Sequence, residues 1–416
     1  MGRDRITELT IQGLRTIDSL TLPLRGLTVL IGENGTGKSS ILEACEILRR
    51  ASGPQFVSEF NSIHGGLFSL LRDGASELRL LVRVEDEEYG LTQGKRGNPP
   101  LKYVVSLARE GAATLIAEEQ LLLDPIPDDE FSLALLFRNR EVASVYNAGV
   151  SQLMPVPVGP TQLMLGSSGI FPPHPQIPRM REALEHIEMH LPFEVLPSWA
   201  AQAHDRRSAM RSPMLLQGAD RLDRLGSNLA NAYHTLRMEY GEEHWRTTME
   251  YIRLGLGEEI ETITTRVDPG GGAIALWMKL RNRDRQLPAS VLADGVLAYL
   301  AFVAMFRLHA ARTLLAFDEP ELHLNPALLV RVVDLFESIA VDYPVILATH
   351  SDRLLDALRD PASSVRVCET DGLAGSTQVR GLDPDALGQW LEGYRGLGDL
   401  RGAGHLSSVL KPEGSA

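Results

Sequence analysis

The fold of this chain is decided by the stretch Gly32-Glu33-Asn34-Gly35-Thr36-Gly37-Lys38-Ser39. It matches the pattern GxxxxGK[ST] at every fixed position. An apolar run at residues 27–31 precedes it, and residues 40–49 carry apolar side chains at helical spacing. Strand, loop and helix is the context in which such a loop cradles phosphate, because inward backbone N–H groups and the positive end of the helix face the anion. The stretch therefore predicts a P-loop nucleotide site.

Each position of the loop has an expected task. Lys38 is expected to reach the β- and γ-phosphates, and the Ser39 hydroxyl to bind Mg²⁺. The remaining phosphate contacts are expected from Gly32, Asn34, Gly35, Thr36, Gly37 and Ser40. ATP and Mg²⁺ are therefore the predicted ligands, although the sequence does not distinguish ATP from GTP.

Two further motifs place polar residues after apolar strands. The run TLLAF ends in Asp318 and Glu319, and the run PVILAT ends in His350. An acid at the end of a buried strand can hold Mg²⁺ through water, which is the task expected of Asp318. Glu319 is placed to polarise the attacking water, and His350 to sense the γ-phosphate. We therefore predict Glu319, Lys38 and His350 as the catalytic set.

The rest of the chain predicts a mixed α/β protein. Three strands are expected within residues 78–123, and they suggest an antiparallel sheet beside the nucleotide core. Residues 150–178 are rich in Pro, Gly and Ser and predict a linker. Helices are expected at 179–192, at 218–255 as one amphipathic helix, and at 291–309. No sustained heptad array occurs, so no long coiled coil is predicted.

Composition excludes several classes of protein. The chain has 416 residues, 44% of them hydrophobic, a net charge of −13 and two cysteines. Two cysteines cannot build a disulfide framework or a four-thiolate metal site. No stretch approaches the roughly 20 apolar residues that span a bilayer. A soluble protein of the cytoplasm without a membrane span is expected. The net charge does not exclude a local basic patch for nucleic acid.

One possible metal motif is weak. His186 and His190 stand four residues apart with Glu188 between them. The order HxExH differs from the zinc motif HExxH, and no third ligand is evident. A surface helix with these residues needs no metal, so we expect none there.

The motifs together carry a family resemblance. The ordered set GENGTGKSS, VLADG, LLAFDEPELHLNP and ILATHS resembles ABC-type ATPases, particularly the OLD/SMC/RecF-like group. The opening IQGLR, the segment LGSNLA and the late segment LDPDALGQWLEGYRGLG also look like that group. The resemblance implies an ABC-ATPase head with a mixed sheet, an added antiparallel sheet and a helical insert. Expected parts are an N-terminal lobe at 1–150, a linker and helical insert at 151–290, and a C-terminal lobe at 291–416, forming one composite domain.

The resemblance also implies a head-to-tail homodimer. In such dimers the LSDG-like segment of one subunit closes over the γ-phosphate bound to the other, a task that falls here to Asp294 and Gly295. Ala293 replaces the usual serine and loses a hydroxyl, which leaves the rate of hydrolysis open. Asn325 is a second departure, at a position near the dimer seam where relatives carry His or Asp.

Two roles remain open at this stage. The Q-loop glutamine, a Mg²⁺ ligand in such proteins, is Gln120, Gln152 or Gln162. Gln162 is favoured because it lies between the sheet region and the helical insert. Arg15 either touches the phosphates or ribose, or faces solvent.

The function implied is an ATP-driven switch that acts on DNA or on a partner protein, in DNA repair, chromosome maintenance or phage defence. Only 66 residues follow His350, too few for a Toprim nuclease domain, so a separate nuclease or effector is expected to do any cutting. The alternatives are the nucleotide-binding subunit of a membrane transporter and a weakly hydrolysing scaffold. The long helical insert and IQGLR argue against the first, and intact Glu319 against the second.

Overall fold

The structure is a computed structural model that describes residues 3–89, 97–124, 132–140, 142–167, 174–196, 208–270, 272–372 and 375–411. A six-stranded sheet lies at the centre of these residues, in the order β10-β15-β16-β3-β17-β18. The first five strands run parallel, and β18 is antiparallel to β17. The strands are β10 (Ile187–His190), β15 (Leu314–Asp318), β16 (Val345–Ala348), β3 (Leu27–Ile31), β17 (Val365–Thr370) and β18 (Thr377–Gly381).

This central sheet separates two apolar cores, because successive side chains of a strand point to opposite faces. On β3, Val29 and Ile31 belong to one core and Leu30 to the other. On β15, Leu315 and Phe317 join the first core, which the helical lobe completes. The second core is shared with α1 (Lys38–Arg50) and the antiparallel sheet. Burial on both faces explains why these strands read as continuous apolar runs in the sequence.

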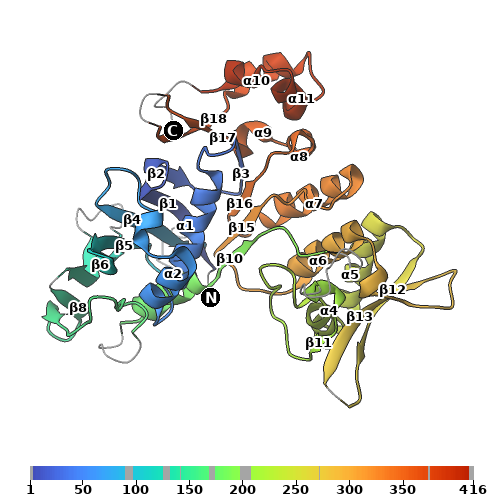
Figure 1. The fold of residues 1–416 in the computed structure, drawn as a ribbon, viewed down its shortest axis with the longest axis horizontal. Coiled ribbons are helices and arrows are strands. Elements are labelled where there is room, and N and C mark those ends of the chain that lie inside the picture. The colour runs from blue at the N-terminus through green and yellow to red at the C-terminus, as the bar shows by residue number, and fades with distance from the viewer. Residues whose placement is uncertain are drawn as a thin grey trace.

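An eight-stranded antiparallel sheet packs on the other side of α1, in the order β2-β1-β4-β5-β6-β7-β8-β9. The three strands predicted within 78–123 are confirmed as β4, β5 and β6. The sheet also takes in the amino-terminal hairpin, which Figure 1 shows in blue beside α1. Its strands are β1 (Asp4–Leu14), β2 (Ile17–Pro23), β4 (Glu77–Asp86), β5 (Leu101–Glu110), β6 (Ala113–Leu123), β7 (Leu133–Asn139), β8 (Ala143–Asn147) and β9 (Gln152–Pro155).

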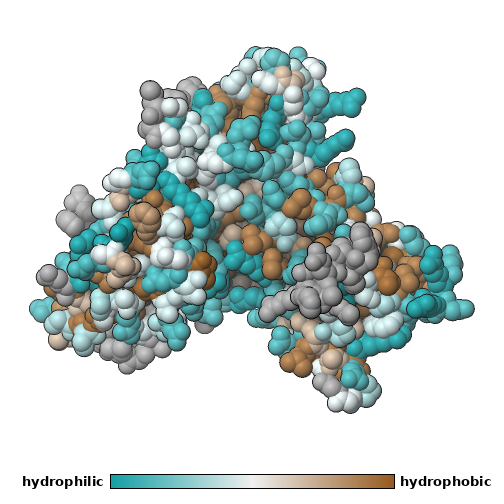
Figure 2. All heavy atoms as spheres, in the orientation of Figure 1, coloured by the Kyte–Doolittle hydropathy of each residue, from teal (hydrophilic) through white to brown (hydrophobic). Residues whose placement is uncertain are grey.

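A second lobe holds three helices against a small sheet, drawn in yellow-green and orange at the right of Figure 1. The prediction of a single helix over 218–255 is wrong. Two helices form instead, and the second begins at Gly241, whose φ of +82° favours glycine. The space-filling view shows a notch between this lobe and the antiparallel-sheet lobe (Figure 2). The elements of the second lobe are α4 (Leu229–Met238), α5 (Gly241–Leu256), α6 (Asp294–Arg307), β11 (Met214–Leu215), β12 (Ile260–Val267), β13 (Ala273–Leu280) and β14 (Leu287–Pro288).

The predicted helix over 179–192 is half right. The helix α3 (Gln176–Glu185) ends early, and the next residues form β10, the edge strand beside β15. The expected boundary at 150 separates β9 from the first sheet, which β9 extends, and β10 of the expected insert belongs to the central sheet. Residues 168–173 of the predicted linker lie outside the described residues.

The carboxyl-terminal part leads from a helix at the right of β15 and β16 up to the top of Figure 1. It contains α7 (Pro326–Ile339), α8 (Asp352–Ala357), α9 (Pro361–Ser364), α10 (Pro384–Leu391) and α11 (Leu397–Gly402). The remaining helices are α2 (Phe56–His64) and the short turns η1 (Leu67–Ser69), η2 (Ala209–Arg211), η3 (Ala289–Val291) and η4 (Leu406–Val409). Among the described residues the longest helix has 16 residues, and none is long and apolar enough to cross a bilayer.

Candidate nucleotide-binding site

The P-loop connects β3 to α1 with the backbone that phosphate binding requires. Gly35 and Gly37 have φ of +82° and +96°, a region that glycine adopts without strain. Gly37 also packs against Thr377 of β18, where a Cβ would lie 2.5 Å from the threonine hydroxyl. Lys38 Nζ donates to the carbonyl oxygens of Gly32 and Glu33 at 2.7 and 2.9 Å. Burial lowers the pKa of Lys38, and a bound polyphosphate would offset that cost.

Backbone donors of the loop are free for an anion. Among the described residues, the N–H groups of Gly35, Gly37, Lys38 and Ser39 donate to no protein acceptor. Such unpaired donors at a helix N-terminus are satisfied by a ligand or by water. With the positive end of α1 behind them, they form a set that fits phosphate oxygens.

The acidic residues lie at the same edge of the sheet as the P-loop. In the parallel register Asp318 pairs with Ala348, and Ala348 with Leu30 of β3. Burial raises the pKa of Asp318, and the nearby carboxylates of Glu319 and Glu321 raise it further. The positive charges of Lys38 and His350 act on the pKa of Asp318 in the opposite direction and lower it. Ser39 and Asp318 line the same cavity, and they are the residues of this edge that could hold Mg²⁺.

Glu319 follows Asp318 with a fixed and uncommon backbone. Its φ is +48°, a left-handed value for a non-glycine residue. Its N–H donates to the carbonyl oxygen of Ala348 at 2.8 Å, which ties the turn after β15 to the end of β16. The expected water-polarising residue is therefore on a constrained turn rather than on a free loop.

The cavity beside the P-loop has a volume of about 500 Å³. Arg15 lines it together with Ser39 and Asp318, so the structure brings Arg15 to the nucleotide side. Its guanidinium is paired with Glu43 at 2.9 Å, and Glu43 also contacts His64 at 3.0 Å. No sequence motif marks His64, because it comes from α2 and reaches the cavity through the packing of that helix against α1.

His350 stands at the carboxyl end of β16, and its side chain is exposed at the same edge. Its position near Asp318 is reflected in the pKa of that acid, which His350 lowers in opposition to burial. The structure therefore brings together the P-loop, Asp318, Glu319 and His350. These are the residues that the sequence proposed for ATP chemistry.

The signature segment lies on the other lobe. Asp294 and Gly295 begin α6, whose neighbours are α4, α5 and α7, whereas α1 contacts β10, β15 and β16. Arg211 belongs to no sequence motif but holds this segment in place. Its guanidinium donates to the carbonyl oxygen of Leu292 at 2.6 Å and also bonds the carboxylate of Asp294. Ala293 is the N-cap of α6 and offers no side-chain bond to its open N–H groups.

Asn325, the other departure from the expected pattern, has a local task. Its side-chain oxygen accepts the N–H of Leu328 at 3.0 Å and caps the N-terminus of α7. An Asn at this position therefore stabilises α7 within one subunit.

The structure places Gln162, the favoured Q-loop candidate, away from the P-loop. Its side chain donates to the Ser167 hydroxyl at 2.9 Å, and nearby Gly166 packs on the backbone of Gly53. Gly53 follows the carboxyl end of α1, whose 13 residues place it about 20 Å from the P-loop. Gln120 and Gln152 lie on β6 and β9 and do not line the cavity either. The strand beside β15 is β10.

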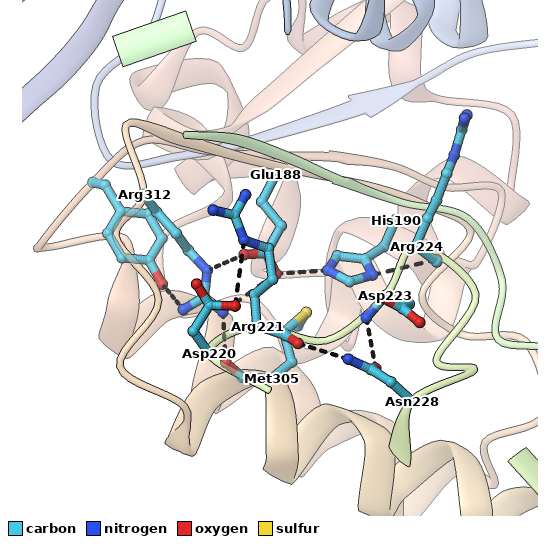
Figure 3. A network of polar contacts seen from close by, with 10 residues as sticks. Glu188, His190, Asp220, Arg221, Asp223, Arg224, Asn228, Met305 and Arg312 are labelled. Carbon is cyan, nitrogen blue, oxygen red and sulfur yellow. Dashed lines mark hydrogen bonds and ion pairs between the residues drawn. The ribbon is translucent and has the colours of Figure 1, made fainter. Parts of the chain in front are cut away.

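The weak HxExH motif has a structural explanation. Glu188 and His190 lie on β10, not on a surface helix, and both are buried. His190 Nε2 bonds Glu188 Oε1 at 2.7 Å, and Arg312 Nε donates to Glu188 Oε2 at 2.7 Å. Figure 3 shows this series of hydrogen bonds continuing from His190 to the carbonyl oxygen of Arg224, in the loop before α4. The described residues contain no cluster of His, Cys, Asp or Glu suited to a metal ion.

Comparison with known families agrees with the motifs. A model described as "AAA ATPase domain" matches residues 5–122. A model described as "AAA domain, putative AbiEii toxin, Type IV TA system" matches residues 174–356. The DNA repair protein RecN of Bacillus subtilis (strain 168) is 29% identical over 261 residues, which cover 58% of this chain and 42% of RecN. The chain thus spans less than half the length of that relative.

Solved structures show the fold. The Smc head bound to the C-terminal winged-helix domain of ScpA superposes with a TM-score of 0.54 at 12% identity, covering 92% of this chain and 99% of the other. An Smc head with an extended coiled coil, bound to the C-terminal domain of ScpA and derived from Pyrococcus furiosus, gives 0.51 at 12% identity, covering 94% and 99%. The chain has the P-loop fold of an ABC-ATPase head and resembles the ABC-type ATPases of the SMC/RecF-like group.

Proposed function

We propose that this chain is an ATP-hydrolysing switch that closes into a head-to-tail dimer on ATP and opens on hydrolysis. The main observation behind the proposal is that one edge of the sheet holds Lys38, Ser39, Asp318 and Glu319. The match to a family model for ATPase domains also supports it. Lys38 and the free amides of the loop bind the β- and γ-phosphates. Ser39 and Asp318 hold Mg²⁺, which neutralises phosphate charge when bound. Glu319 accepts the proton of the attacking water, with His350 beside the γ-phosphate.

The separation of the two lobes supports the dimer. Asp294 and Gly295 begin a helix on the lobe that does not contact α1, so the positive end of α6 is available to a nucleotide bound by another subunit. Arg211 holds this segment in place through its bonds to Leu292 and Asp294. One subunit thus contributes the P-loop and acids to a site, and its partner contributes the signature.

DNA is the substrate class that the similarities favour. RecN is named as a DNA repair protein, and the Smc heads are solved with domains of ScpA, a partner protein. We propose that ATP-driven closure of this chain is used on DNA or on a separate effector protein such as a nuclease. DNA repair, chromosome maintenance and phage defence are all consistent with such a switch.

The first test is steady-state ATP hydrolysis with and without linear duplex DNA. We expect turnover that rises on adding DNA and is lost in Glu319→Gln, measured as phosphate release in the presence of Mg²⁺. Turnover that does not respond to DNA would redirect the proposal to a protein partner. Absence of turnover under both conditions would contradict the ATPase proposal itself.

The Ala293→Ser variant tests the altered signature. Ala293 is exposed, and its φ and ψ of −66° and 151° suit an N-cap serine without a backbone change. The new hydroxyl should stabilise the protein by about 1 kcal/mol as a helix cap, seen as a higher melting temperature without nucleotide. If it also reaches the γ-phosphate of a partner, it should add roughly 1.5–3 kcal/mol to ATP-dependent dimerisation.

Light scattering with ATP in a Glu319→Gln background separates these two effects, because the cap acts in the monomer. Ala293→Gly is the matched control, since glycine is tolerated at an N-cap but carries no hydroxyl. If Ala293→Ser raises the thermal stability but does not increase ATP-dependent dimerisation, a signature role for this segment would be contradicted.

A further inference from the structure

The backbone of His350 is held from two sides by charged side chains outside the expected ATP chemistry. Its N–H donates to Glu321 Oε1 at 3.2 Å, and its carbonyl oxygen accepts from Arg401 Nη1 at 3.3 Å. Glu321 belongs to the loop after β15, whereas Arg401 lies on α11, 51 residues beyond His350. Two segments far apart in the sequence therefore fix one residue at the end of β16.

Both side chains brace the neighbouring residues as well. Glu321 Oε1 accepts a second bond from the Thr349 hydroxyl at 2.7 Å, and that hydroxyl accepts the N–H of Ser351 at 3.0 Å. Arg401 Nη1 also donates to Asp352 Oδ1 at 3.1 Å, at the first turn of α8. The loop from β16 to α8 is thus tied to the acidic loop on one side and to α11 on the other.

The helix α11 is itself locked onto α8, beside which it lies at the top of Figure 1. Asp356 Oδ1 accepts the N–H of Gly398 at 2.7 Å. A Cβ on Gly398 would overlap the carbonyl oxygen of Asp352, so the two backbones approach as closely as glycine allows. Arg401 is therefore presented to the His350 loop by a rigid contact between helices.

The positive charge of Arg401 also acts on Lys38 of the P-loop. Its side chain is 20% exposed, so its charge is partly shielded from water. Burial is the main cause of the lowered pKa of Lys38, and the positive charge of Arg401 lowers it further. The guanidinium of Arg401 thus bonds the His350 backbone, and its charge also acts on Lys38 of the P-loop.

The geometry points to Arg401, with Glu321 as its counterpart, as a positioning residue that sets the place of His350 for ATP turnover. The inference rests on the proposed ATPase function and deepens it, because it makes the carboxyl-terminal helix α11 part of the nucleotide site. Arg401 acts through the His350 backbone. A displacement of α11 should therefore move the imidazole without altering the P-loop, and thereby change the rate of hydrolysis rather than the binding of ATP.

The test compares Arg401→Ala, Arg401→Lys and His350→Ala by steady-state kinetics. Misplacing a reacting group by about an ångström costs on the order of 100-fold in rate, so Arg401→Ala should lower kcat by roughly 10- to 100-fold with the KM for ATP nearly unchanged. Arg401→Lys should retain more kcat than Arg401→Ala, because lysine keeps a cationic donor at the end of a long side chain. In a His350→Ala background, Arg401→Ala should have little further effect, since both changes remove the same contribution.

The matched control is Arg359→Ala, because Arg359 follows the same helix α8 but pairs with Asp334 and Glu337 on the exposed surface. It should keep the kcat of the wild type. Additive losses in the double variant, or equal losses in Arg359→Ala, would overturn the inference.

Hydrogen exchange gives a readout that needs no hydrolysis. Without nucleotide, Arg401→Ala should speed exchange in a peptide covering residues 349–355, and Arg359→Ala should not. If the wild type hydrolyses no ATP but the exchange changes as expected, the ATPase proposal fails and the positioning contact stands. If exchange at 349–355 is unchanged in Arg401→Ala, the positioning role is refuted whatever the wild-type activity.

Discussion

Glu319→Gln is expected to lower ATP turnover by roughly 10²- to 10⁴-fold, the range typical of removing a general base. Glutamine keeps the size of the side chain but cannot accept the proton of the attacking water. The left-handed backbone at Glu319 and its bond to Ala348 come from the main chain, so the turn should survive the substitution. Binding of ATP by Lys38 and the loop amides should remain, and the ATP-bound dimer should therefore persist longer.

Two measurements check this expectation together. Phosphate release gives the loss of turnover, and light scattering after ATP addition gives the lifetime of the dimer. Lys38→Ala should instead abolish both ATP binding and dimer formation. The surface variant Glu258→Gln is the matched control, because the side chain of Glu258 is 79% exposed and forms a long ion pair with Arg281 at 3.6 Å. Full turnover in Glu319→Gln would show that another group positions the water, and a short-lived dimer would favour a scaffold without a hydrolytic cycle.

Arg312→Ala is expected to destabilise the fold by about 3–5 kcal/mol, since removing one partner of a buried ion pair leaves the other charge unpaired. The side chains of Arg312 and Glu188 are 3% and 5% exposed. Arg312 also donates to the carbonyl oxygen of Met305 and the hydroxyl of Tyr343, at 2.7 and 3.1 Å. Its loss therefore leaves several buried acceptors without a donor, in the network drawn in Figure 3. Urea unfolding at pH 7, followed by circular dichroism, measures the change.

The pH dependence of this effect has a definite sign. Burial by itself raises the pKa of Glu188, but Arg312 and His190 outweigh it and lower the pKa from 4.5 to about 2. A carboxyl whose pKa is lower in the folded state stabilises the fold above its unfolded pKa, and this stabilisation is lost as the pH falls toward the folded value. The gap in stability between wild type and Arg312→Ala should therefore be full at pH 7 and shrink between pH 4.5 and 2.

Arg359→Ala is the control for charge removal as such, because that arginine is 68% exposed and surface ion pairs contribute at most about 1 kcal/mol. The double variant Glu188→Gln with Arg312→Met should recover part of the loss, since it removes both buried charges. A destabilisation by Arg312→Ala that does not vary with pH would argue that packing, rather than the ion pair, holds β10 against β15.

Errors in the sequence-based expectations cluster at β10. Its four buried residues continue the apolar spacing of α3, and a short buried strand cannot be told from a helical turn by periodicity alone. A helix over 179–192 leaves the strand beside β15 unidentified. Sequence position between the sheet region and the helical insert favours Gln162, which the structure places near the far end of α1. The same ambiguity predicts a surface helix for Glu188 and His190, which the structure buries as a pair on β10.

The sequence by itself determined the P-loop, the acids after β15 and the order of the motifs, because each of these depends on a few adjacent residues and on the local step from strand to loop or helix. The tertiary structure alone decided which strands are neighbours, and hence which side chains share the sheet edge with Lys38. It also decided that Arg211 holds the signature segment and that Arg401 reaches His350. The physical reason is that a charged side chain finds its partner through chain packing over long sequence separations, and no local pattern of residues records that contact.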